Sequence, residues 1–123
     1  MTDFKLFDST IWIDYFTKSK HQKMIDTEET FYLSVLSLFE IKKKFLKDKI
    51  NLELIEENMN FIKSKSIILD VTEEIIDLAV KVSFEKDIPM TDSLIYATAI
   101  HQNAFLITLD NDFRGLEKVK ILQ

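Results

Sequence analysis

Short runs of apolar residues alternate along the chain with longer stretches in which apolar residues recur at helical spacing. Five runs are brief and rich in aromatic or branched aliphatic side chains, which predicts strands over residues 4–8, 30–34, 66–69, 104–108 and 119–122. Five stretches with helical periodicity predict helices over residues 9–16, 35–48, 51–63, 73–86 and 92–102. Strands and helices therefore alternate along most of the chain.

Capping residues mark where two of the predicted helices begin. Thr72 has the side chain of a good N-cap, and two glutamates follow it in the first turn, where the helix dipole favours anions. Thr91 is the expected cap of the last helix, which follows Pro89. This interpretation leaves the carboxylate of Asp92 free for another use.

Each predicted strand is an apolar run rather than a strict alternation of apolar and polar residues. Such strands are typical of parallel sheets that helices cover on both faces. We therefore expect a single α/β domain that spans residues 1–123. In such sheets ligands bind beyond the carboxyl ends of the strands, so the chemistry is expected at that edge.

Composition restricts the classes of protein to which the chain can belong. It contains no cysteine, which excludes a disulfide framework, a thiolate zinc site and a cysteine nucleophile. A reducing, cytoplasmic setting is the easiest fit. The first residues do not resemble a secretion signal, and no apolar run approaches the roughly 20 residues needed to cross a bilayer. We expect a soluble protein.

Three aspartates are predicted to meet at the carboxyl edge of the sheet. Asp8 ends the first strand, and Asp110 follows the fourth strand by two residues. Asp92 opens the helix that leads into the fourth strand, and such a helix runs antiparallel to the strands, which brings Asp92 to the same edge. Each is alternatively a helix cap, since aspartate is favoured at these junctions. For Asp8, the following Ser9 and Thr10 offer caps instead.

Two further acids are candidates for the same cluster. Glu40 lies in the second predicted helix, just outside its apolar arc, and has a side chain long enough to reach the edge. The alternative for Glu40 is a surface ion pair with Lys44, which contributes only about 0.2–0.5 kcal/mol. Asp112 is either a fifth acid of the cluster or the cap of a final short helix that Phe113 anchors.

Carboxylates gathered at one edge, without cations between them, repel one another unless a divalent cation lies among them. Carboxylate oxygens favour Mg²⁺ or Mn²⁺ over softer metals. Such an ion activates water and stabilises the charge that develops on a phosphoryl group. Asp8, Glu40, Asp92 and Asp110 therefore predict a catalytic centre for phosphodiester hydrolysis.

Lysines are expected to supply any affinity for nucleic acid, because the net charge of -5 opposes binding. One lysine-rich segment spans residues 18–23, after the first helix. The other lies on the second helix, where we expect phosphate contacts from Lys43, Lys44 and Lys47. The alternative is an ordinary solvated surface.

Four motifs together resemble the PIN domain, and within it the toxins of the virulence-associated protein C (VapC) type. The motifs are LFDSTIWID, SVLSLFEI, MTDSLIYATAI and LITLDNDF, and they occur in the expected order over nearly the whole chain. The resemblance implies a doubly wound parallel sheet and Mg²⁺- or Mn²⁺-dependent cleavage of RNA, often of tRNA. It also implies an antitoxin that plugs the active site, and it suggests homodimers.

The resemblance implies roles for individual residues. The acidic metal ligands correspond to four positions, with a fifth as a further candidate: Asp8, Glu40, Asp92, Asp110 and Asp112. Ser9, Thr10 and Thr108 match hydroxyl positions that orient carboxylates or water. The lysines of the second helix become expected RNA contacts.

Two features depart from the family pattern. In many members the last motif has an aspartate three residues after Thr-x-Asn, whereas here only Asn111 separates Asp110 from Asp112. Because the strand is expected to end at Thr108, we expect Asp110 to lie nearer the metal, with Asp112 as a cap or as an outer residue that holds a water. Arginine is almost absent, with Arg114 alone.

Two other classes fit parts of the pattern. A response-regulator receiver has a similar length, with Asp70 as the conceivable phosphoacceptor and Thr108 as the switch hydroxyl. A receiver normally has a pair of acids after the first strand, whereas Asp8 is followed by Ser9 and Thr10. The second alternative is a non-catalytic binding module on the same fold, although such a module would be expected to have lost some of the acids.

Overall fold

The structure is a computed structural model, and it describes residues 4–123. Its elements are, in chain order, β1 (Lys5–Phe7), α1 (Ser9–Lys18), α2 (Gln22–Ile25), β2 (Phe31–Ser34), α3 (Val35–Lys47), α4 (Leu52–Lys65), β3 (Ser66–Leu69), α5 (Glu73–Lys86), α6 (Met90–His101), β4 (Phe105–Thr108), η1 (Asn111–Phe113) and β5 (Val119–Ile121). The predicted strands and helices are all present within a few residues of their expected ends. The short helix α2 and the 3₁₀ turn η1 complete the set.

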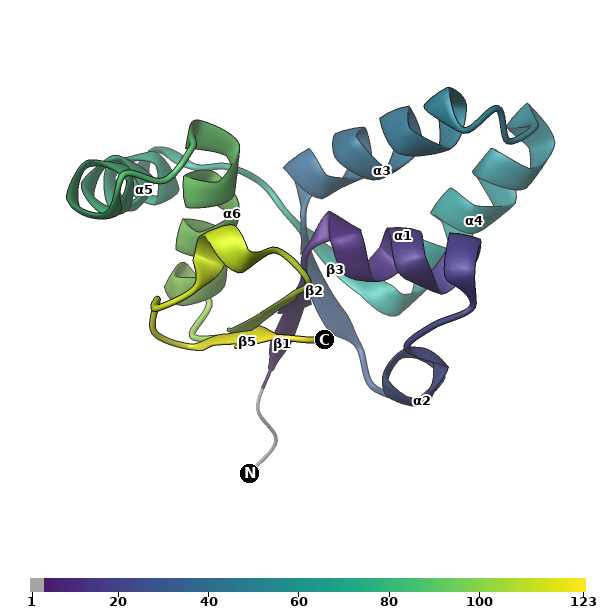
Figure 1. Ribbon diagram of the computed structural model, residues 1–123, viewed down its shortest axis with the longest axis horizontal. Coiled ribbons are helices and arrows are strands. Elements are labelled where there is room, and N and C mark those ends of the chain that lie inside the picture. Colours follow the sequence, from purple (N-terminus) through teal and green to yellow (C-terminus); the bar gives the residue numbers. More distant parts are fainter. Residues whose placement is uncertain (1–3) are drawn as a thin grey trace.

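The strands form a parallel sheet in the order β3-β2-β1-β4-β5. β1 lies at the centre, so the chain first builds outward through β2 and β3 and then returns to add β4 and β5 on the other side. Figure 1 shows α1, α3 and α4 on one side of the sheet and α5 and α6 on the other. The expected doubly wound α/β architecture is therefore confirmed.

The strand order removes the receiver alternative. A receiver has the order 2-1-3-4-5, in which the third strand lies inside the sheet. Here β3 is an edge strand, and Asp70 follows it as an exposed residue without regular secondary structure. Asp70 therefore lies away from the centre of the sheet, where a phosphoacceptor would be required.

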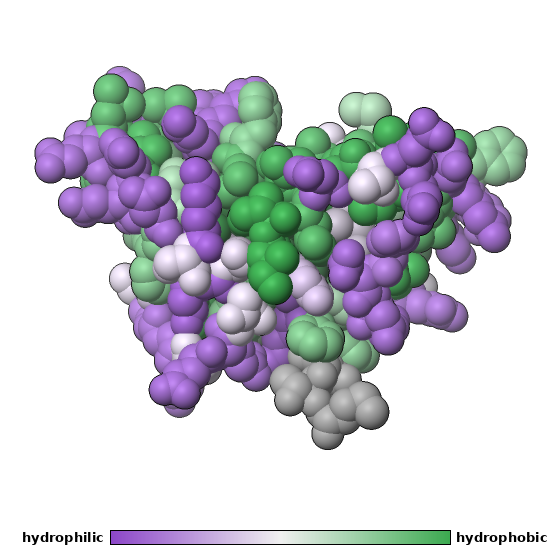
Figure 2. Space-filling view, turned by 180° about the vertical axis from the view of Figure 1, so that it is seen from behind, coloured by the Kyte–Doolittle hydropathy of each residue, from purple (hydrophilic) through white to green (hydrophobic). Residues whose placement is uncertain are grey.

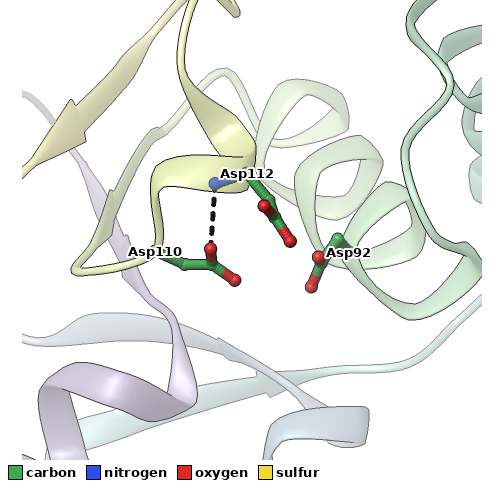
Figure 3. Close-up of side chains that lie close together, drawn as sticks. All are labelled: Asp92, Asp110 and Asp112. Carbon is green, nitrogen blue, oxygen red and sulfur yellow. Dashed lines mark hydrogen bonds between the residues drawn. The ribbon is translucent and has the colours of Figure 1, made fainter.

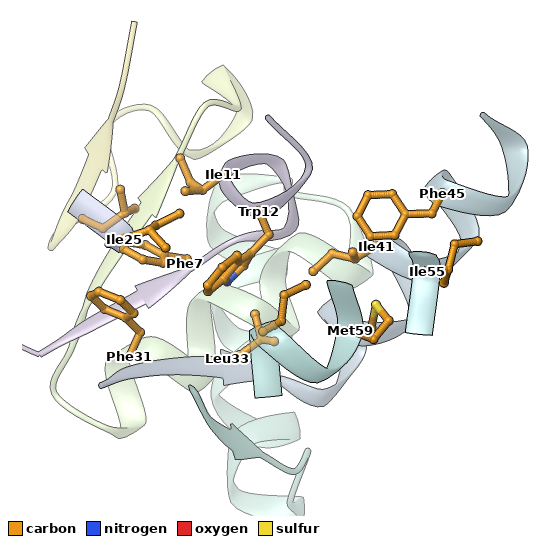
Figure 4. Close-up of a cluster of buried hydrophobic side chains, with 12 residues drawn as sticks. Phe7, Ile11, Trp12, Ile25, Phe31, Leu33, Ile41, Phe45, Ile55 and Met59 are labelled. Atoms are coloured by element: carbon orange, nitrogen blue, oxygen red, sulfur yellow. The ribbon is translucent and has the colours of Figure 1, made fainter. Parts of the chain in front are cut away.

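Consecutive residues of the central strands are buried on opposite faces of the sheet. Leu6 and Leu106 pack against side chains of α6, whereas Phe7 and Ile107 pack with residues of α1, α3 and α4. The larger of these clusters surrounds Trp12, which is fully buried (Figure 4). Because both faces are covered, the strands consist of continuous apolar runs, and the aromatic residues of α1 belong to the core.

The beginnings of the helices are only partly as predicted. The Thr72 hydroxyl accepts a hydrogen bond from the Ile75 amide and caps α5, as expected. The prediction that Thr91 caps α6 is wrong, because α6 begins at Met90 and Pro89 occupies the cap position without a capping side chain. The helix therefore begins two residues earlier than a threonine cap at position 91 would place it.

Apolar side chains also reach the surface. Figure 2 shows hydrophobic residues down the middle of the rear face, with hydrophilic residues on both flanks and a notch at the upper edge. Several large side chains on α5 and at the start of α6 are well exposed, among them Phe84 at 89% and Met90 at 73%. No helix within residues 4–123 is long and apolar enough to span a membrane.

Candidate active site

Asp8 lies directly after β1 and caps α1 with its own side chain. Its Oδ1 atom accepts hydrogen bonds from the Thr10 amide at 2.9 Å and the Ser9 hydroxyl at 3.1 Å, and its Oδ2 atom accepts one from the Thr108 hydroxyl. The expectation that Ser9 or Thr10 would act as the cap is wrong, because both lie inside the helix. Only 4% of Asp8 is exposed, so these donors hold its carboxylate in one position.

Two threonines fasten the end of β4 to the start of α1. The fully buried Thr108 hydroxyl donates to Asp8 and accepts a hydrogen bond from the Asp110 amide at 3.0 Å. The Thr10 hydroxyl accepts a hydrogen bond from the Leu109 amide at 3.1 Å. The hydroxyl residues named from the sequence therefore do lie against the acids, and Thr108 connects two of them.

Three aspartates point toward one another beside Asp8. One carboxylate oxygen from each of Asp92, Asp110 and Asp112 lies within 4.8 Å of the other two. Asp92 comes from the first turn of α6, and the other two come from the segment that follows β4 (Figure 3). Residues far apart in the sequence thus meet at the carboxyl edge of the sheet, as predicted.

Asp110, and not Asp112, caps the short helix; the sequence leaves Asp112 open as either the cap or a fifth acid of the cluster. Asp110 is the N-cap of η1, since its Oδ1 atom accepts a hydrogen bond from the Asp112 amide at 2.9 Å. Asp112 lies within η1 and is exposed, which leaves its carboxylate available to the acidic group. Phe113, 1% exposed, anchors the turn as expected.

Glu40 faces the same acids from α3. Its Oε1 atom is buried and has no hydrogen-bond partner within residues 4–123. The alternative pairing with Lys44 is wrong, because Lys44 instead contacts Asp48 at 3.1 Å. Burial raises the pKa of the Glu40 carboxyl, the charge of Asp8 raises it further, and the nearby Ser9 hydroxyl offsets part of this rise.

The pKa of Asp92 is also raised, from 3.8 to about 6. Burial is the largest cause, followed by the negative charges of Asp110, Asp8 and Asp112. None of the five acids forms a salt bridge within residues 4–123. The described part of the chain therefore holds mutually repelling carboxylates close together without a compensating cation.

The lysines that the sequence named for phosphate contacts all lie in the second half of α3. Lys43 lies over the ring of Phe39, with its Nζ atom 5.7 Å from the ring centre. Lys44 contacts Asp48 at 3.1 Å, and Lys47 is exposed in the last turn. The single arginine, Arg114, donates a hydrogen bond to the Asn111 side chain at 2.9 Å beside η1.

One buried carboxylate with two basic side chains beside it was not found from the sequence. Asp14, on α1, is 8% exposed and lies 3.6 Å from both Lys18 and His21. The spacing between Asp14 and Lys18 suits a helical ion pair. The approach of His21 depends on a left-handed backbone conformation, with φ of 68°, for which the sequence has no signal.

The raised pKa of Asp92 predicts how stability depends on pH. Between the ordinary value of 3.8 and about 6, the folded state binds the proton more tightly than the unfolded state, so stability falls as pH rises through this window. With EDTA present, we expect a higher melting temperature at pH 5 than at pH 7.5. The difference should shrink in Asp92→Asn but not in Asp77→Asn, an exposed aspartate on α5. Equal pH dependence in both variants would contradict this explanation.

Solved structures with the same fold include bacterial toxins. A toxin-antitoxin complex from Klebsiella pneumoniae has a TM-score of 0.79 at 24% identity, covering 94% of this chain and 95% of that chain. VapBC2 from Rickettsia felis, bound to a promoter DNA fragment, has a TM-score of 0.77 at 19% identity, covering 97% of both chains. VapC20 from Mycobacterium tuberculosis, described as a Sarcin-Ricin loop cleaving toxin, has a TM-score of 0.70 at 11% identity, covering 95% and 98%.

Sequence comparison assigns the chain to a family. No curated protein sequence matches it significantly. The model of the PIN domain, however, matches residues 5–119, which include all the acids described above. The chain therefore belongs to the PIN domain family.

Proposed function

We propose that the protein is a Mg²⁺- or Mn²⁺-dependent endoribonuclease of the VapC type and the toxin of a toxin-antitoxin pair. The observation that carries this proposal is the group formed by Asp92, Asp110 and Asp112, which adjoins Asp8 and Glu40 without a salt bridge in residues 4–123. Structural neighbours described as toxins support the biological role, and one of them is described as a Sarcin-Ricin loop cleaving toxin. We take tRNA as the first substrate to test.

The residues of the site fit a divalent cation. All the donors are carboxylate oxygens, which Mg²⁺ and Mn²⁺ prefer. Asp92, Asp110 and Asp112 would hold the ion, together with Asp8, whose Oδ2 atom accepts a single hydrogen bond within residues 4–123 and retains a lone pair. When bound, such an ion lowers the pKa of a water and stabilises negative charge on the phosphoryl group.

Glu40 is the residue best placed to move a proton. It has a raised pKa and a buried oxygen without a partner in the described chain, and both properties suit a proton acceptor. As the oxygen of water forms a bond to phosphorus, Glu40 accepts the proton that this water loses. The bond from phosphorus to the leaving oxygen breaks, and that oxygen takes a proton from solvent.

Cleavage of RNA by purified protein tests this function. We expect labelled tRNA or single-stranded RNA to be cut internally with Mn²⁺ or Mg²⁺ and to stay intact with EDTA. Asp92→Asn, purified in parallel, controls for contaminating nucleases. RNA that is bound but never cut would favour the non-catalytic binding module instead.

We expect Asp110 to be more important for metal binding than Asp112. The charge of Asp110 is a larger cause of the raised pKa of Asp92 than that of Asp112, and Asp110 also affects Glu40. Asparagine is a good N-cap, so Asp110→Asn should keep η1 folded. The Mn²⁺ concentration for half-maximal cleavage should rise about tenfold or more in Asp110→Asn and less in Asp112→Asn. The reverse ranking would make Asp112 the principal ligand.

The proposed biology includes a protein partner. A free toxin of this kind would need an antitoxin, and several structural neighbours are toxin-antitoxin complexes. The absence of cysteine is consistent with action in the reducing cytoplasm. A short DNA-binding protein encoded directly upstream and purified with this chain would support the pairing.

We further propose a homodimer that buries the apolar face of α5 and the start of α6. The lining residues of this face, among them Ile76, Val80, Phe84 and Met90, include no charged side chain. A second copy can therefore dock against the same face without burying an unpaired charge. Light scattering should give twice the monomer mass for the wild type and the monomer mass for Phe84→Glu. Phe39→Glu, at an exposed position on α3, should remain dimeric, and a monomeric wild type would refute the dimer.

A further inference from the structure

A pocket of about 620 Å³ lies between α1 and α3 and adjoins the acidic group through Asp110. α1 lines it with residues spaced at i, i+3, i+4, i+7 and i+8, which form one face of the helix: Thr10, Ile13, Asp14, Thr17 and Lys18. α3 contributes Lys44 and Asp48, and the segment after β4 contributes Leu109 and Asp110. Its volume lies within the usual range for small-ligand pockets.

The pocket combines apolar walls with two lysines. Ile13 and Leu109 offer apolar contact surface, and Lys18 and Lys44 enter from different helices. The hydroxyl of Thr10 already accepts a hydrogen bond from the Leu109 amide, which leaves its proton free to be donated. Apolar contact for a flat ring, beside cations for a phosphate, is the combination that a nucleotide requires.

Both lysines can exchange their present partners at small cost. Lys44 contacts Asp48 at 3.1 Å, and Lys18 contacts Asp14 at 3.6 Å, each within its own helix. The lysine side chains are 49% and 62% exposed, and ion pairs at such positions contribute little to stability. Asp14 also keeps His21 as a neighbour when Lys18 leaves. Phosphates are therefore able to replace these carboxylates.

We propose that this pocket binds the nucleotide next to the scissile phosphodiester of RNA, with Lys18 and Lys44 on its phosphates. This assignment rests on the proposed ribonuclease function and adds the path that the RNA strand follows across the protein. Asp110 belongs to both the acidic group and the pocket. An RNA strand whose scissile phosphodiester lies at the carboxylates therefore continues into the space between α1 and α3.

A pair of double variants tests the pocket. Lys18→Gln with Lys44→Gln removes both proposed contacts, whereas Lys42→Gln with Lys63→Gln removes the same charge from a separate groove between α3 and α4. The probe is a fluorescent single-stranded oligoribonucleotide of randomised sequence. Its binding is measured by anisotropy in the Asp92→Asn background, so that turnover does not consume it.

We expect the first pair to weaken binding about tenfold and to reduce the salt slope by about 1.4, since each phosphate contact on a single strand contributes about 0.7. The control pair should change the affinity less than about twofold. Asp48→Asn, which frees Lys44, should strengthen binding. Amide signals of Ile13 and Leu109 should shift when the oligoribonucleotide is added.

Equal losses in the two double variants, or binding that leaves the pocket amides unchanged, would overturn the proposal and leave the pocket to a protein partner. The outcome is separable from that of the proposed function. Pocket binding in a wild-type protein that never cuts RNA would refute the nuclease but keep the nucleotide site. Cleavage with the same KM in both double variants would support the ribonuclease function and refute the nucleotide site in the pocket.

Discussion

Asp92→Asn should reduce RNA cleavage at least roughly 100-fold while the protein stays folded. Asp92 makes no side-chain hydrogen bond or salt bridge within residues 4–123, so replacing one carboxylate oxygen by an amide nitrogen disturbs no described contact. The change removes one charge from the acidic group and relieves repulsion, so the metal-free protein should be at least as stable as the wild type. Cleavage rates at saturating Mn²⁺ and melting temperatures in EDTA are the measurements.

Asp77→Asn is the matched control, because it makes the same change at an exposed position on α5. It should cleave RNA at the wild-type rate. Asp8 is a less suitable test, because its carboxylate accepts hydrogen bonds from Ser9, Thr10 and Thr108. In Asp8→Asn, the amide NH₂ group would replace one of the accepting oxygens and face a hydrogen-bond donor. The variant would then lose stability, and a loss of activity could not be attributed to the metal site alone. Wild-type cleavage by highly purified Asp92→Asn would rule out the assignment of the site.

Thr108→Val should be the most destabilising conservative change at the site. The Thr108 hydroxyl is buried, donates to Asp8 and accepts from the Asp110 amide. Valine has the same shape and leaves both partners without this hydrogen bond, which costs about 2–3 kcal/mol. Because Asp8 and Asp110 would lose their common support, the Mn²⁺ concentration for half-maximal cleavage should also rise.

Thr98→Val is the control for Thr108→Val. Thr98 is equally buried, but its hydroxyl only donates to the Leu94 carbonyl one turn earlier in α6, so its loss should cost less than about 1 kcal/mol. Denaturant unfolding without metal measures both free energies. Thr108→Ser keeps the hydroxyl, so its Mn²⁺ concentration for half-maximal cleavage should be close to that of the wild type. Equal losses in the two valine variants would mean that Thr108 has no special role.

The fold was predictable because each strand lies within an apolar run of its own. β3 has the predicted ends, Ser66 and Leu69, and Thr72 caps the following helix as expected. α2 has only four residues, Gln22–Ile25, which is too short for helical periodicity to be visible. The start of α6 was misplaced because a threonine after Pro89 looked like the stronger cap.

The meeting of the acids was predictable, but their local roles were not. The topology rule for parallel sheets placed Asp8, Asp92 and Asp110 at one edge, and the structure brings them together. Which aspartate caps η1 depends on a single hydrogen bond, from the Asp112 backbone amide to the Asp110 carboxylate. The sequence offers both residues for that bond. Glu40 was ambiguous for a similar reason, since Lys44 had a second acidic partner available in Asp48.

The most direct test of the acidic group as a catalytic metal centre is to measure Mn²⁺ binding and the rate of RNA cleavage on the same protein sample. Free Mn²⁺ is measured by electron paramagnetic resonance along a titration, and cleavage is measured at each point. We expect half-saturation and half-maximal cleavage to coincide, and Asp110→Asn to shift both to higher Mn²⁺ together. Full cleavage in EDTA, or Mn²⁺ binding that is unchanged in Asp92→Asn, Asp110→Asn and Asp112→Asn, would contradict the assignment of this metal centre.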